Sequence, residues 1–472
     1  MIEVDISGTE FSYDMKALAM VFYPEKECRV VEHPEVSTED GYSIKWQMDG
    51  KKWEKLFPNP YTKNQIKKEA YEYLKTKSGK ELPWGILTGI RPAKIPLRLM
   101  MQGQEEAAIW DILKEEYFCR DDKVKLAMDV AKKEFSLTQG MQHERCANVY
   151  IGIPFCPTIC AYCSFSSFPA GRYRDKMDAY LDALEKEMTQ CKEWLAGKQM
   201  VSVYVGGGTP TSLSEEQFER LMAMTEKYLP MEQSKEFTVE AGRPDSITEG
   251  KLRSMKTHGV TRISINPQSM KEHTLELLGR KHTVEEIREK FMLARTLGFD
   301  NINMDLIAGL PEETLEDFKE TLREVEALKP DSITVHTLVI KRASRLRKEQ
   351  LEQGGEMREE DACIEPMQKE AEQFCRVHGY EPYYMYRQKN KAHTTRNTNQ
   401  ENVAYAKPGK ECLYNIFIME ELQSILALGS GGSSKIVFPE ENRMERVENV
   451  KSVDDYIGRI DEMIRRKKES WR

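Results

Sequence analysis

This 472-residue chain lacks the segments that mark membrane and secreted proteins. It contains no window of about 18 apolar residues, so no transmembrane helix is expected. The first residues, Met1-Ile-Glu-Val-Asp5, are acidic at once and lack the basic, apolar and small-residue regions of a secretory signal. Long proline- or serine-rich runs are also scarce, as is typical of a globular chain.

The distribution of cysteines and the net charge further limit the classes of protein to which this chain could belong. The ten cysteines are scattered over the whole chain and do not form the dense pattern of a disulfide framework, which favours a reducing cytoplasm. The net charge of −8 argues against a surface that coats nucleic acid. The short basic run at residues 465–468 is typical of a solvated helix end.

A chain of this length is expected to form two or three domains. Residues 1–145 read as a small α/β domain, with an alternating strand at 42–47 and helices at 63–75 and 123–135. Residues 146–345 form a second unit, and residues 346–472 form a C-terminal α+β extension with a substrate or lid role.

The central unit repeats a strand-then-helix pattern six times. This pattern predicts parallel strands joined by crossover helices. A closed eightfold barrel would need two more units, so the sequence predicts an open, partial (β/α)6 barrel. The expected strands are residues 147–153, 201–206, 236–240, 260–265, 301–306 and 332–338.

Three cysteines follow the first of these strands. Cys156, Cys160 and Cys163 have the spacing C-x3-C-x2-C, and short spacings of this kind hold iron–sulfur cubes. Three ligands leave one of the four irons open. The alternative is a zinc knuckle, but zinc sites normally close with four ligands. No fourth Cys or His lies nearby, and Cys146 precedes the strand, so the redox cluster is the favoured interpretation.

Polar or glycine-rich positions also follow the next strands. In parallel β/α folds, ligands bind at these carboxyl ends of the strands. Three glycines let backbone N–H groups approach a ligand closely, although a tight turn would also explain them. Together with the glycine segment, polar residues at three further strand ends would surround one polar ligand. These positions are Gly206, Gly207, Gly208, Thr209, Glu240, Gln268 and Asp305.

The cysteine spacing, with the aromatic Tyr162 before the last cysteine, resembles the radical S-adenosylmethionine (SAM) superfamily. The resemblance implies a [4Fe–4S] cluster on Cys156, Cys160 and Cys163 and SAM on the open iron. An electron from the cluster would cleave SAM to methionine and a 5′-deoxyadenosyl radical. The wider pattern resembles the oxygen-independent coproporphyrinogen III oxidases and their HemZ-type branch.

The resemblance also implies a SAM-binding shell. Tyr150 and Tyr162 would flank SAM, residues 206–209 would meet its methionyl end, and Glu240 and Asp305 would lie near its ribose or amine. Gln268 and Arg280 would complete the shell. One departure concerns Gly152, because many oxidases of the wider group have histidine two residues after the aromatic that corresponds to Tyr150.

The sequence indicates the substrate-binding residues less clearly than the SAM-binding residues. Arg91, in the apolar and turn-rich run 82–94, and Arg387, in the tyrosine-rich run 383–388, are candidates for binding propionates, because arginine pairs bidentately with carboxylates. Either arginine could instead tie its own unit to the barrel, and residues 82–94 read better as a docking loop than as a substrate contact. The run 383–388 could be a lid or a strand at the edge of the barrel.

Three smaller expectations concern the C-terminal part of the chain. Residues 347–378 read as a charged helix, and residues 413–419 read as a strand. Residues 455–466 read as one helix with an apolar docking face. The loop 389–400 is long and polar.

By resemblance, the reaction is the oxidative decarboxylation of coproporphyrinogen III to protoporphyrinogen IX. The alternatives are a haem carrier that retains the scaffold and a radical methyltransferase that opens the haem ring. The expected partners are a tetrapyrrole substrate and an electron donor such as flavodoxin or ferredoxin, with no nucleic acid and no membrane span.

Overall fold

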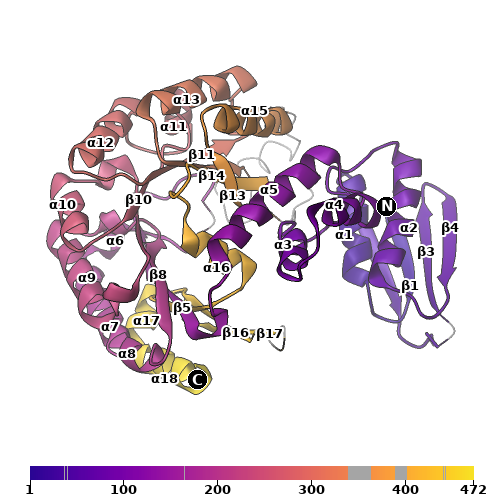
Figure 1. The fold of residues 1–472 in the computed structure, drawn as a ribbon, viewed down its shortest axis with the longest axis horizontal. Coiled ribbons are helices and arrows are strands. Elements are labelled where there is room, and N and C mark those ends of the chain that lie inside the picture. Colours follow the sequence, from indigo (N-terminus) through magenta and orange to yellow (C-terminus); the bar gives the residue numbers. More distant parts are fainter. Residues whose placement is uncertain are drawn as a thin grey trace.

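The structure is a computed structural model that describes residues 1–36, 38–39, 41–163, 165–338, 363–388, 401–438, 441 and 443–471. It contains one sheet of four strands, one of eleven and one of two. Figure 1 shows the four-stranded sheet in a unit of its own, joined by helices to a curved body that contains the eleven-stranded sheet.

The N-terminal unit is an α/β layer with its own core. Its strands are β1 (Ile2–Ser7), β2 (Cys28–His33), β3 (Tyr42–Met48) and β4 (Lys51–Phe57), in the order β2-β1-β3-β4. Inward and outward residues alternate along β3, as expected for a half-buried strand. Helices α1 (Ser12–Phe22) and α2 (Lys63–Ser78) pack on each other, and α1 also packs on the sheet. The strand expected at 42–47 and the helix expected at 63–75 are confirmed.

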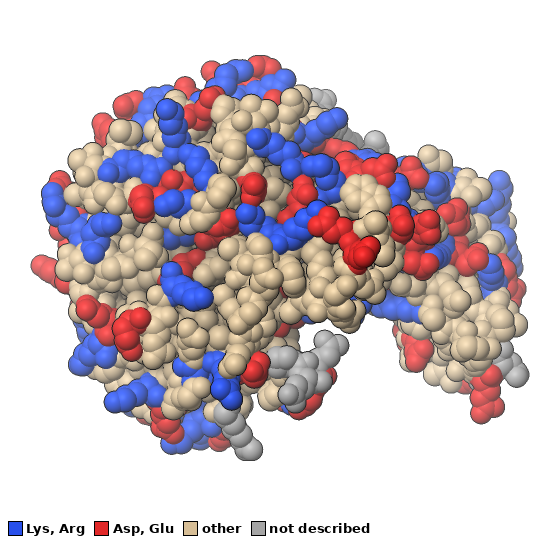
Figure 2. All heavy atoms as spheres, in the orientation of Figure 1, with Lys and Arg blue, Asp and Glu red and all other residues tan. Residues whose placement is uncertain are grey.

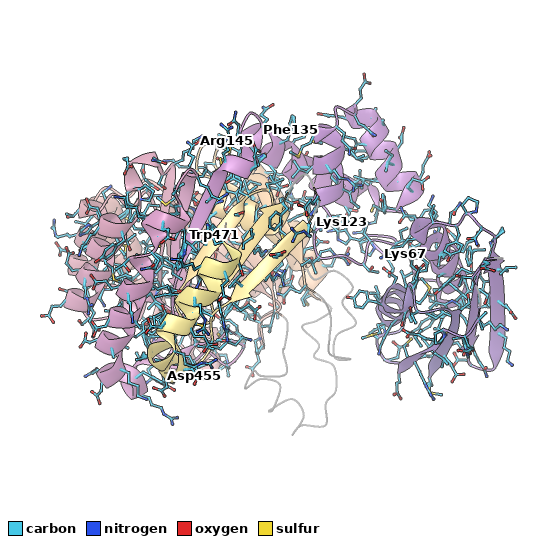
Figure 3. All side chains as sticks on the ribbon, turned by 90° about the horizontal axis from the view of Figure 1, so that it is seen from below. Lys67, Lys123, Phe135, Arg145, Asp455 and Trp471 are labelled. Atoms are coloured by element: carbon cyan, nitrogen blue, oxygen red, sulfur yellow. The ribbon has the colours of Figure 1, made fainter. Side chains whose placement is uncertain are left out.

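Three α-helices and a π-helical turn lead from this unit to the main body. They are α3 (Lys94–Met101), α4 (Glu106–Asp111), the π-helical turn Ile112–Glu116 and α5 (Asp121–Thr138). Helix α5 contains the helix expected at 123–135, and it packs on the main sheet. Its buried Lys123, labelled in Figure 3, pairs with Glu401 at 2.8 Å, and the Trp84 indole donates to the same carboxylate at 2.5 Å. The docking interpretation of the run 82–94 agrees with this contact.

The centre of the main sheet consists of six neighbouring parallel strands, as the sequence predicts. Nearly all of their residues are buried, because crossover helices cover one face and polar side chains of the site fill the other. The six strands are β5 (Cys146–Ile153), β8 (Gln199–Gly207), β9 (Glu236–Gly242), β10 (Arg262–Ile265), β11 (Ile302–Ala308) and β12 (Ser332–Thr337).

Helices line the outer side of this curved sheet (Figure 1). Several begin at a serine or threonine whose side chain accepts a backbone N–H, which satisfies a donor that the helix itself leaves open. The crossover helices are α7 (Met177–Met188), α8 (Cys191–Trp194), α9 (Glu215–Tyr228), α10 (Glu249–Thr257), α11 (Glu272–Leu277), α12 (Val284–Thr296) and α13 (Leu315–Leu328).

Segments from the C-terminal part extend the sheet at both edges. Beside β12 lie β14 (Glu401–Ala406) and then β13 (Glu381–Arg387), both in antiparallel pairs. Beside β5 lies the parallel strand β15 (Ser424–Leu428), followed by β16 (Ser433–Phe438) and β17 (Arg443–Glu448). The run 383–388 is therefore a strand at this edge, and the partial barrel is part of an eleven-stranded sheet.

The strand expected at residues 413–419 is wrong, because this segment is helix α16 (Leu413–Glu420). The buried carboxylate of Glu236, on strand β9, accepts hydrogen bonds from the backbone N–H groups of Leu413 at 2.6 Å and Tyr414 at 3.3 Å. A carboxylate at this position satisfies open N–H groups of the first helical turn and favours the helix.

Two other C-terminal expectations are modified. The segment 455–466 is two helices, α17 (Val453–Gly458) and α18 (Ile460–Ser470), with Tyr456 and Met463 fully buried, and Figure 3 labels Asp455 and Trp471 on this pair. Helix α15 (Ile364–Val377) covers the last part of the expected helix 347–378. Its earlier part and the loop 389–400 lie outside the described residues.

A buried pair of carboxyl groups lies where α5 meets α16. Glu134 and Glu420 are 0% and 1% exposed, and no hydrogen-bond partner is found for their carboxylate oxygens among the described residues. Burial and the charge of Glu420 raise the pKa of Glu134 well above its ordinary value. Burial also raises the pKa of Glu420 to about 7, against the opposing effect of Arg91 and Lys94.

On the face shown in Figure 2, lysine and arginine side chains are intermixed with aspartate and glutamate. Within the described residues, no helix combines the length and the apolar character that crossing a bilayer requires.

Candidate functional site

A cavity of about 620 Å³ opens at the carboxyl ends of the six parallel strands. One side of its wall is the cysteine loop, and the opposite side includes Tyr384, Tyr386 and Gln388 from β13 and the residue after it. Between them lie side chains from β5, β8, β9, β10, β11 and β12. This is the end of a parallel sheet where ligands bind, so we take the cavity as the candidate active site.

The cysteine loop is held by short local pairings. Strand β6 (Phe155–Cys156) pairs with β7 (Phe168–Pro169), and helix α6 (Ala170–Tyr173) follows directly. The backbone N–H of Ala161 donates to Leu278 at 3.0 Å, and the hydroxyl of Thr158 donates to Gly279 at 3.2 Å. The loop is therefore fixed to the segment after α11, and Cys156, Cys160 and Cys163 all line the cavity.

The thiols fit a cluster better than a single metal ion. Zinc sites normally close with four ligands, and His336, at the far end of the row of parallel strands, is the only other Cys or His among the described residues that line the cavity. Three thiols on one loop that face one cavity match the three protein ligands of a cube with an open iron. The donor set therefore agrees with the expected [4Fe–4S] cluster.

Two arginines stand beside Cys160, and the sequence predicted only one of them. Nη1 of Arg280 and Nη1 of Arg243 each lie 3.9 Å from the Cys160 sulfur. Arg280 also donates to the Tyr162 hydroxyl at 3.3 Å, and Arg243 forms a bidentate pair with Asp245 at 2.7 and 2.9 Å. Both arginines are almost fully buried, so their positive charge lies next to the Cys160 sulfur in a low-dielectric environment.

The glycines at positions 206–208 allow close packing against neighbouring residues, and two of them also line the cavity. A Cβ at Gly208 would lie 2.5 Å from the Phe155 carbonyl oxygen, and a Cβ at Gly206 would lie 2.9 Å from the carboxyl carbon of Glu240. Gly207 has a φ of +117°, which favours glycine. Gly207, Gly208 and Thr209 line the cavity, whereas Gly206 packs against Glu240 outside the lining set. The segment therefore permits close packing as well as ligand contact.

Aromatic rings form one wall of the cavity. Tyr150 stacks with Tyr204 and Tyr414, with ring centroids 6.2 and 6.0 Å apart, and the latter two rings are 4.6 Å apart. The Tyr204 hydroxyl donates to Glu240 at 2.6 Å. Burial raises the pKa of Glu240 to about 7, and the hydroxyl bond opposes this shift. Tyr150 and Glu240 thus lie at one wall of the cavity.

Gln268, which follows β10, lies beside Asp305 of β11. The backbone N–H of Gln268 donates to the Asp305 carbonyl at 2.9 Å, and Gln268 adopts a φ of +70°. His336, which the sequence analysis did not single out, places its Nε2 3.8 Å from the Asp305 carboxylate. Burial opposes ionisation of Asp305, but His336 and Asn303 outweigh it and hold its pKa below the ordinary value. His336 follows from the same rule as the predicted residues, since it lies near the end of β12.

Arg91 and Arg387 are not among the described residues that line the cavity. Arg91 donates to the Met419 carbonyl at 2.8 Å and pairs with Glu421 at 2.5 Å. Arg387 donates to the Leu87 carbonyl at 2.5 Å, and its guanidinium lies 5.6 Å from the Trp84 ring centre. Both arginines join the run 82–94 to the main body, which agrees with the alternative that they tie their own units to the barrel.

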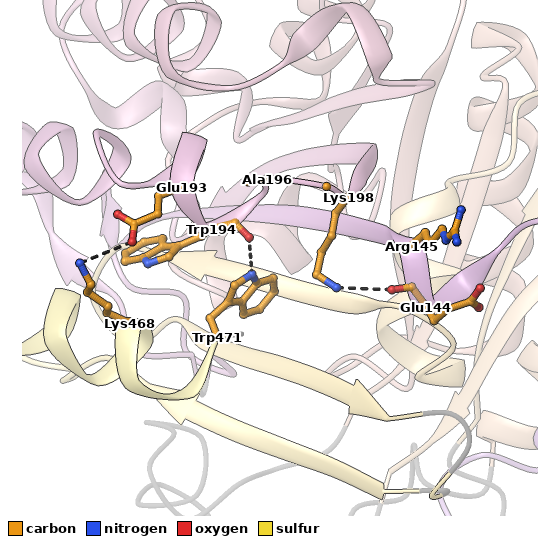
Figure 4. Close-up of a pocket in the computed structure, with 9 residues that line it drawn as sticks. Glu144, Arg145, Glu193, Trp194, Ala196, Lys198, Lys468 and Trp471 are labelled. Carbon is orange, nitrogen blue, oxygen red and sulfur yellow. Dashed lines mark hydrogen bonds and ion pairs between the residues drawn. The ribbon is translucent and has the colours of Figure 1, made fainter.

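A second pocket of about 360 Å³ lies at the opposite end of the strands (Figure 4). Glu144 and Lys198, which precede β5 and β8, are joined by a hydrogen bond of 3.4 Å from Lys198 to the Glu144 carbonyl. The Trp471 indole donates to the Trp194 carbonyl at 2.6 Å and fixes the end of α18 there. Because ligands of parallel folds bind at the carboxyl ends of strands, we place the candidate site in the larger cavity.

The Asp305→Ala variant tests the polar side of the cavity. Loss of a charge-assisted hydrogen bond is expected to weaken SAM binding about ten- to a hundredfold, equivalent to roughly 1.5–3 kcal/mol, with iron content unchanged. Equilibrium binding of SAM to reconstituted protein measures the effect. Asp300→Ala is the control, because Asp300 is 84% exposed, pairs with Lys410, and lies before the same strand. Equal affinity in both variants would show that Asp305 does not contact SAM.

Comparison with known proteins agrees with this fold and site. Residues 150–325 match the radical SAM superfamily, whose members use a [4Fe–4S] cluster and SAM. The oxygen-independent coproporphyrinogen-III oxidase-like protein HemZ of Bacillus subtilis is 39% identical over 403 residues, which cover 84% of this chain and 79% of HemZ. The chain therefore belongs to the oxygen-independent coproporphyrinogen III oxidase-like family of radical SAM proteins.

Two further comparisons cover less of the chain or show the fold alone. The heme chaperone HemW of Bacillus subtilis is 38% identical over 194 residues, which cover 41% of this chain and 50% of HemW. The structure of the radical SAM enzyme HemN, coproporphyrinogen III oxidase of Escherichia coli, superimposes with a TM-score of 0.50 at 24% identity. It covers 70% of this chain and 72% of HemN. The partial-barrel fold class is thereby confirmed.

Proposed function

We propose that this protein oxidatively decarboxylates the propionate side chains of coproporphyrinogen III to vinyl groups, giving protoporphyrinogen IX. Membership of the coproporphyrinogen oxidase-like family supports this reaction, and the HemZ relative covers most of the chain. The division of the chain into units 1–145, 146–345 and 346–472 remains part of this proposal, with the last unit closing the site.

The observation that carries the proposal is the convergence of the cysteine loop and most of the predicted SAM-binding side chains on one cavity. The three thiols, the aromatic wall of Tyr150, and the carboxylates of Glu240 and Asp305 all face or border the same space. This set of groups suits the binding of SAM beside the cysteine loop, which an enzyme that consumes SAM requires. The arrangement therefore favours an enzyme.

A cluster held by Cys156, Cys160 and Cys163, with SAM beside it, would supply the chemistry that removes a hydrogen atom from a propionate side chain. The electron released with CO2 would pass to an acceptor. The residues of the chain bind, orient and exclude water. Arg243 and Arg280 place positive charge beside the thiolates, and Glu240 and Asp305 offer acceptors to the polar groups of SAM. The tyrosine side chains of β13 provide an apolar wall for a large ring opposite the cysteine loop.

A second candidate function is haem transport, favoured by the 38% identity to the heme chaperone HemW across 194 residues. A carrier is expected to bind haem without consuming SAM. An enzyme is expected to consume SAM in proportion to the tetrapyrrole that it converts.

The experiment that separates these functions is anaerobic incubation of the reconstituted protein with SAM, a reductant and either coproporphyrinogen III or haem. Mass spectrometry of the tetrapyrrole then reports the reaction. Stepwise loss of two carboxyl groups supports the proposal, and unchanged haem held by the protein supports the carrier. A methylated, ring-opened haem would identify a methyltransferase. Flavodoxin or ferredoxin in place of the chemical reductant tests the proposed class of electron donor.

A further inference from the structure

A glycine-rich loop forms the wall of the cavity next to the first strand. It joins β15 to β16, and its residues Ser430 and Gly431 line the cavity beside Gly152. Gly429 has a φ of +90°, and a Cβ there would clash with the Gly152 carbonyl oxygen. The loop therefore approaches β5 as closely as two glycines permit, on the strand that leads into the cysteine loop.

Tyr180, on α7, joins the two sides of this contact. Its ring is fully buried, and its hydroxyl donates to the Gly152 carbonyl at 2.7 Å. The same hydroxyl oxygen accepts the backbone N–H of Ser430 at 3.0 Å. One hydroxyl group thus fixes the spacing between strand β5 and the loop.

Glu187 lies two turns further along α7 and is also fully buried. Its Oε2 accepts the backbone N–H of Gly429 at 2.9 Å and the Tyr456 hydroxyl at 2.6 Å. Its Oε1 accepts the amide of Asn449 at 2.9 Å and pairs with Lys467, which is also fully buried. The carboxylate is therefore surrounded by donors from four separate segments.

We propose that Tyr180 and Glu187 are positioning residues that set the shape of the SAM-binding cavity through the loop at 429–432. Lys467 brings α18 into the same network, so the C-terminal helix contributes to a cavity wall that it does not line. The proposal rests on SAM binding in this cavity and is independent of which tetrapyrrole is the substrate.

The physical basis is the cost of an unsatisfied group. A buried carboxylate that loses one of its donors, or a loop N–H that loses its acceptor, relaxes toward another partner or toward water. The loop has little side-chain packing of its own to resist that movement, because three of its four residues are glycines. A small displacement of its backbone would change the distance between the cavity wall and any ligand beside the cysteine loop.

The Tyr180→Phe variant tests the proposal with minimal change in volume. Reconstituted protein is assayed for dithionite-driven SAM cleavage in the absence of a tetrapyrrole. The KM for SAM is expected to rise about tenfold, which corresponds to about 1.4 kcal/mol, while kcat at saturating SAM and the iron content stay within about twofold. Because no tetrapyrrole is present, a failure of the decarboxylase proposal leaves this result interpretable.

Tyr380→Phe is the matched control. The Tyr380 hydroxyl is also buried and donates to a backbone carbonyl, that of Pro330 at 2.7 Å, but it lies away from the cavity. A purely structural role for Tyr180 predicts equal changes in thermal stability and an unchanged KM in both variants, and this outcome would overturn the proposal.

A second pair of variants tests the link to α18. Lys467→Met leaves the charge of Glu187 without its cationic partner, so the KM for SAM is expected to rise as in Tyr180→Phe. Adding Glu187→Gln removes the unpaired charge and is expected to restore part of the affinity. A KM that stays at the wild-type value in Lys467→Met would exclude α18 from the network.

Discussion

The Cys160→Ala variant, prepared anaerobically, is expected to lose the charge-transfer absorption of the cluster and nearly all of its iron. The wild-type protein should hold about four irons per chain. The structure explains the size of the effect, because Cys160 shares one short loop with Cys156 and Cys163, and these three thiols line the cavity. Among the described residues that line it, no further cysteine is present to replace a lost ligand. Iron analysis and visible absorption measure the outcome.

The control for this experiment is Cys363→Ala. Cys363 is a half-buried thiol that directly precedes α15 and lies outside the set of residues that line the cavity. It is expected to leave iron content and absorption unchanged. An unchanged iron content in Cys160→Ala would contradict the cluster assignment. The cysteines at positions 28, 119, 191, 375 and 412 are likewise expected to be dispensable for the cluster.

The second large effect concerns the buried carboxyl pair. Glu420→Gln is expected to raise the free energy of unfolding at pH 8 by up to about 3 kcal/mol, and to give no gain at pH 4. The pKa of Glu420 rises from 4.5 to about 7 on folding, mainly because of burial. Below pH 4.5 both states hold the proton. Between pH 4.5 and 7 only the folded state holds it, so wild-type stability falls as the pH rises, and above pH 7 the loss is complete.

Glu421→Gln is the matched control, and it is expected to lower the free energy of unfolding at pH 8 where Glu420→Gln raises it. Glu421 is the next residue in the chain, but it pairs with Arg91 at 2.5 Å and with Lys435 at 3.5 Å. Although burial opposes it, the charge of Arg91 holds the pKa of Glu421 below its ordinary value. Its stabilisation is therefore present above pH 4.5, and the substitution should destabilise the protein at pH 8. Denaturant unfolding at several pH values measures both variants, and equal effects would refute the buried-pair interpretation.

The sequence was most informative where chemistry follows a local rule. The six parallel strands, the cysteine loop, and the polar residues in the middle or carboxyl-terminal part of β9 and β11 follow from residue spacing and from the tendency of ligands to bind at that side of a parallel sheet. His336 and Arg243 obey the same rule and could have been found by extending it to every strand end. Residue spacing does not predict contacts between segments that are far apart in the sequence.

Three features depend on such distant contacts. Helix α16 forms because Glu236 of β9 caps it, although its apolar run alone resembles a strand. Arg91 and Arg387 bind backbone carbonyls of other segments, which their spacing does not reveal. The pairing of β15 with β5 joins residues separated by most of the chain. In each case the partner that decides the conformation lies in a different unit.

The two C-terminal additions to the sheet have a consequence for self-association. In a six-stranded open barrel, β5 and β12 would each present a row of unpaired N–H and C=O groups, which is a template for pairing with another molecule. Here β15 covers β5, and β14 covers β12. A chain cut after residue 345 would retain the cysteine loop but expose both edges, so it would be prone to aggregation. The segments that complete the cavity therefore also protect the radical SAM core from pairing with its own copies.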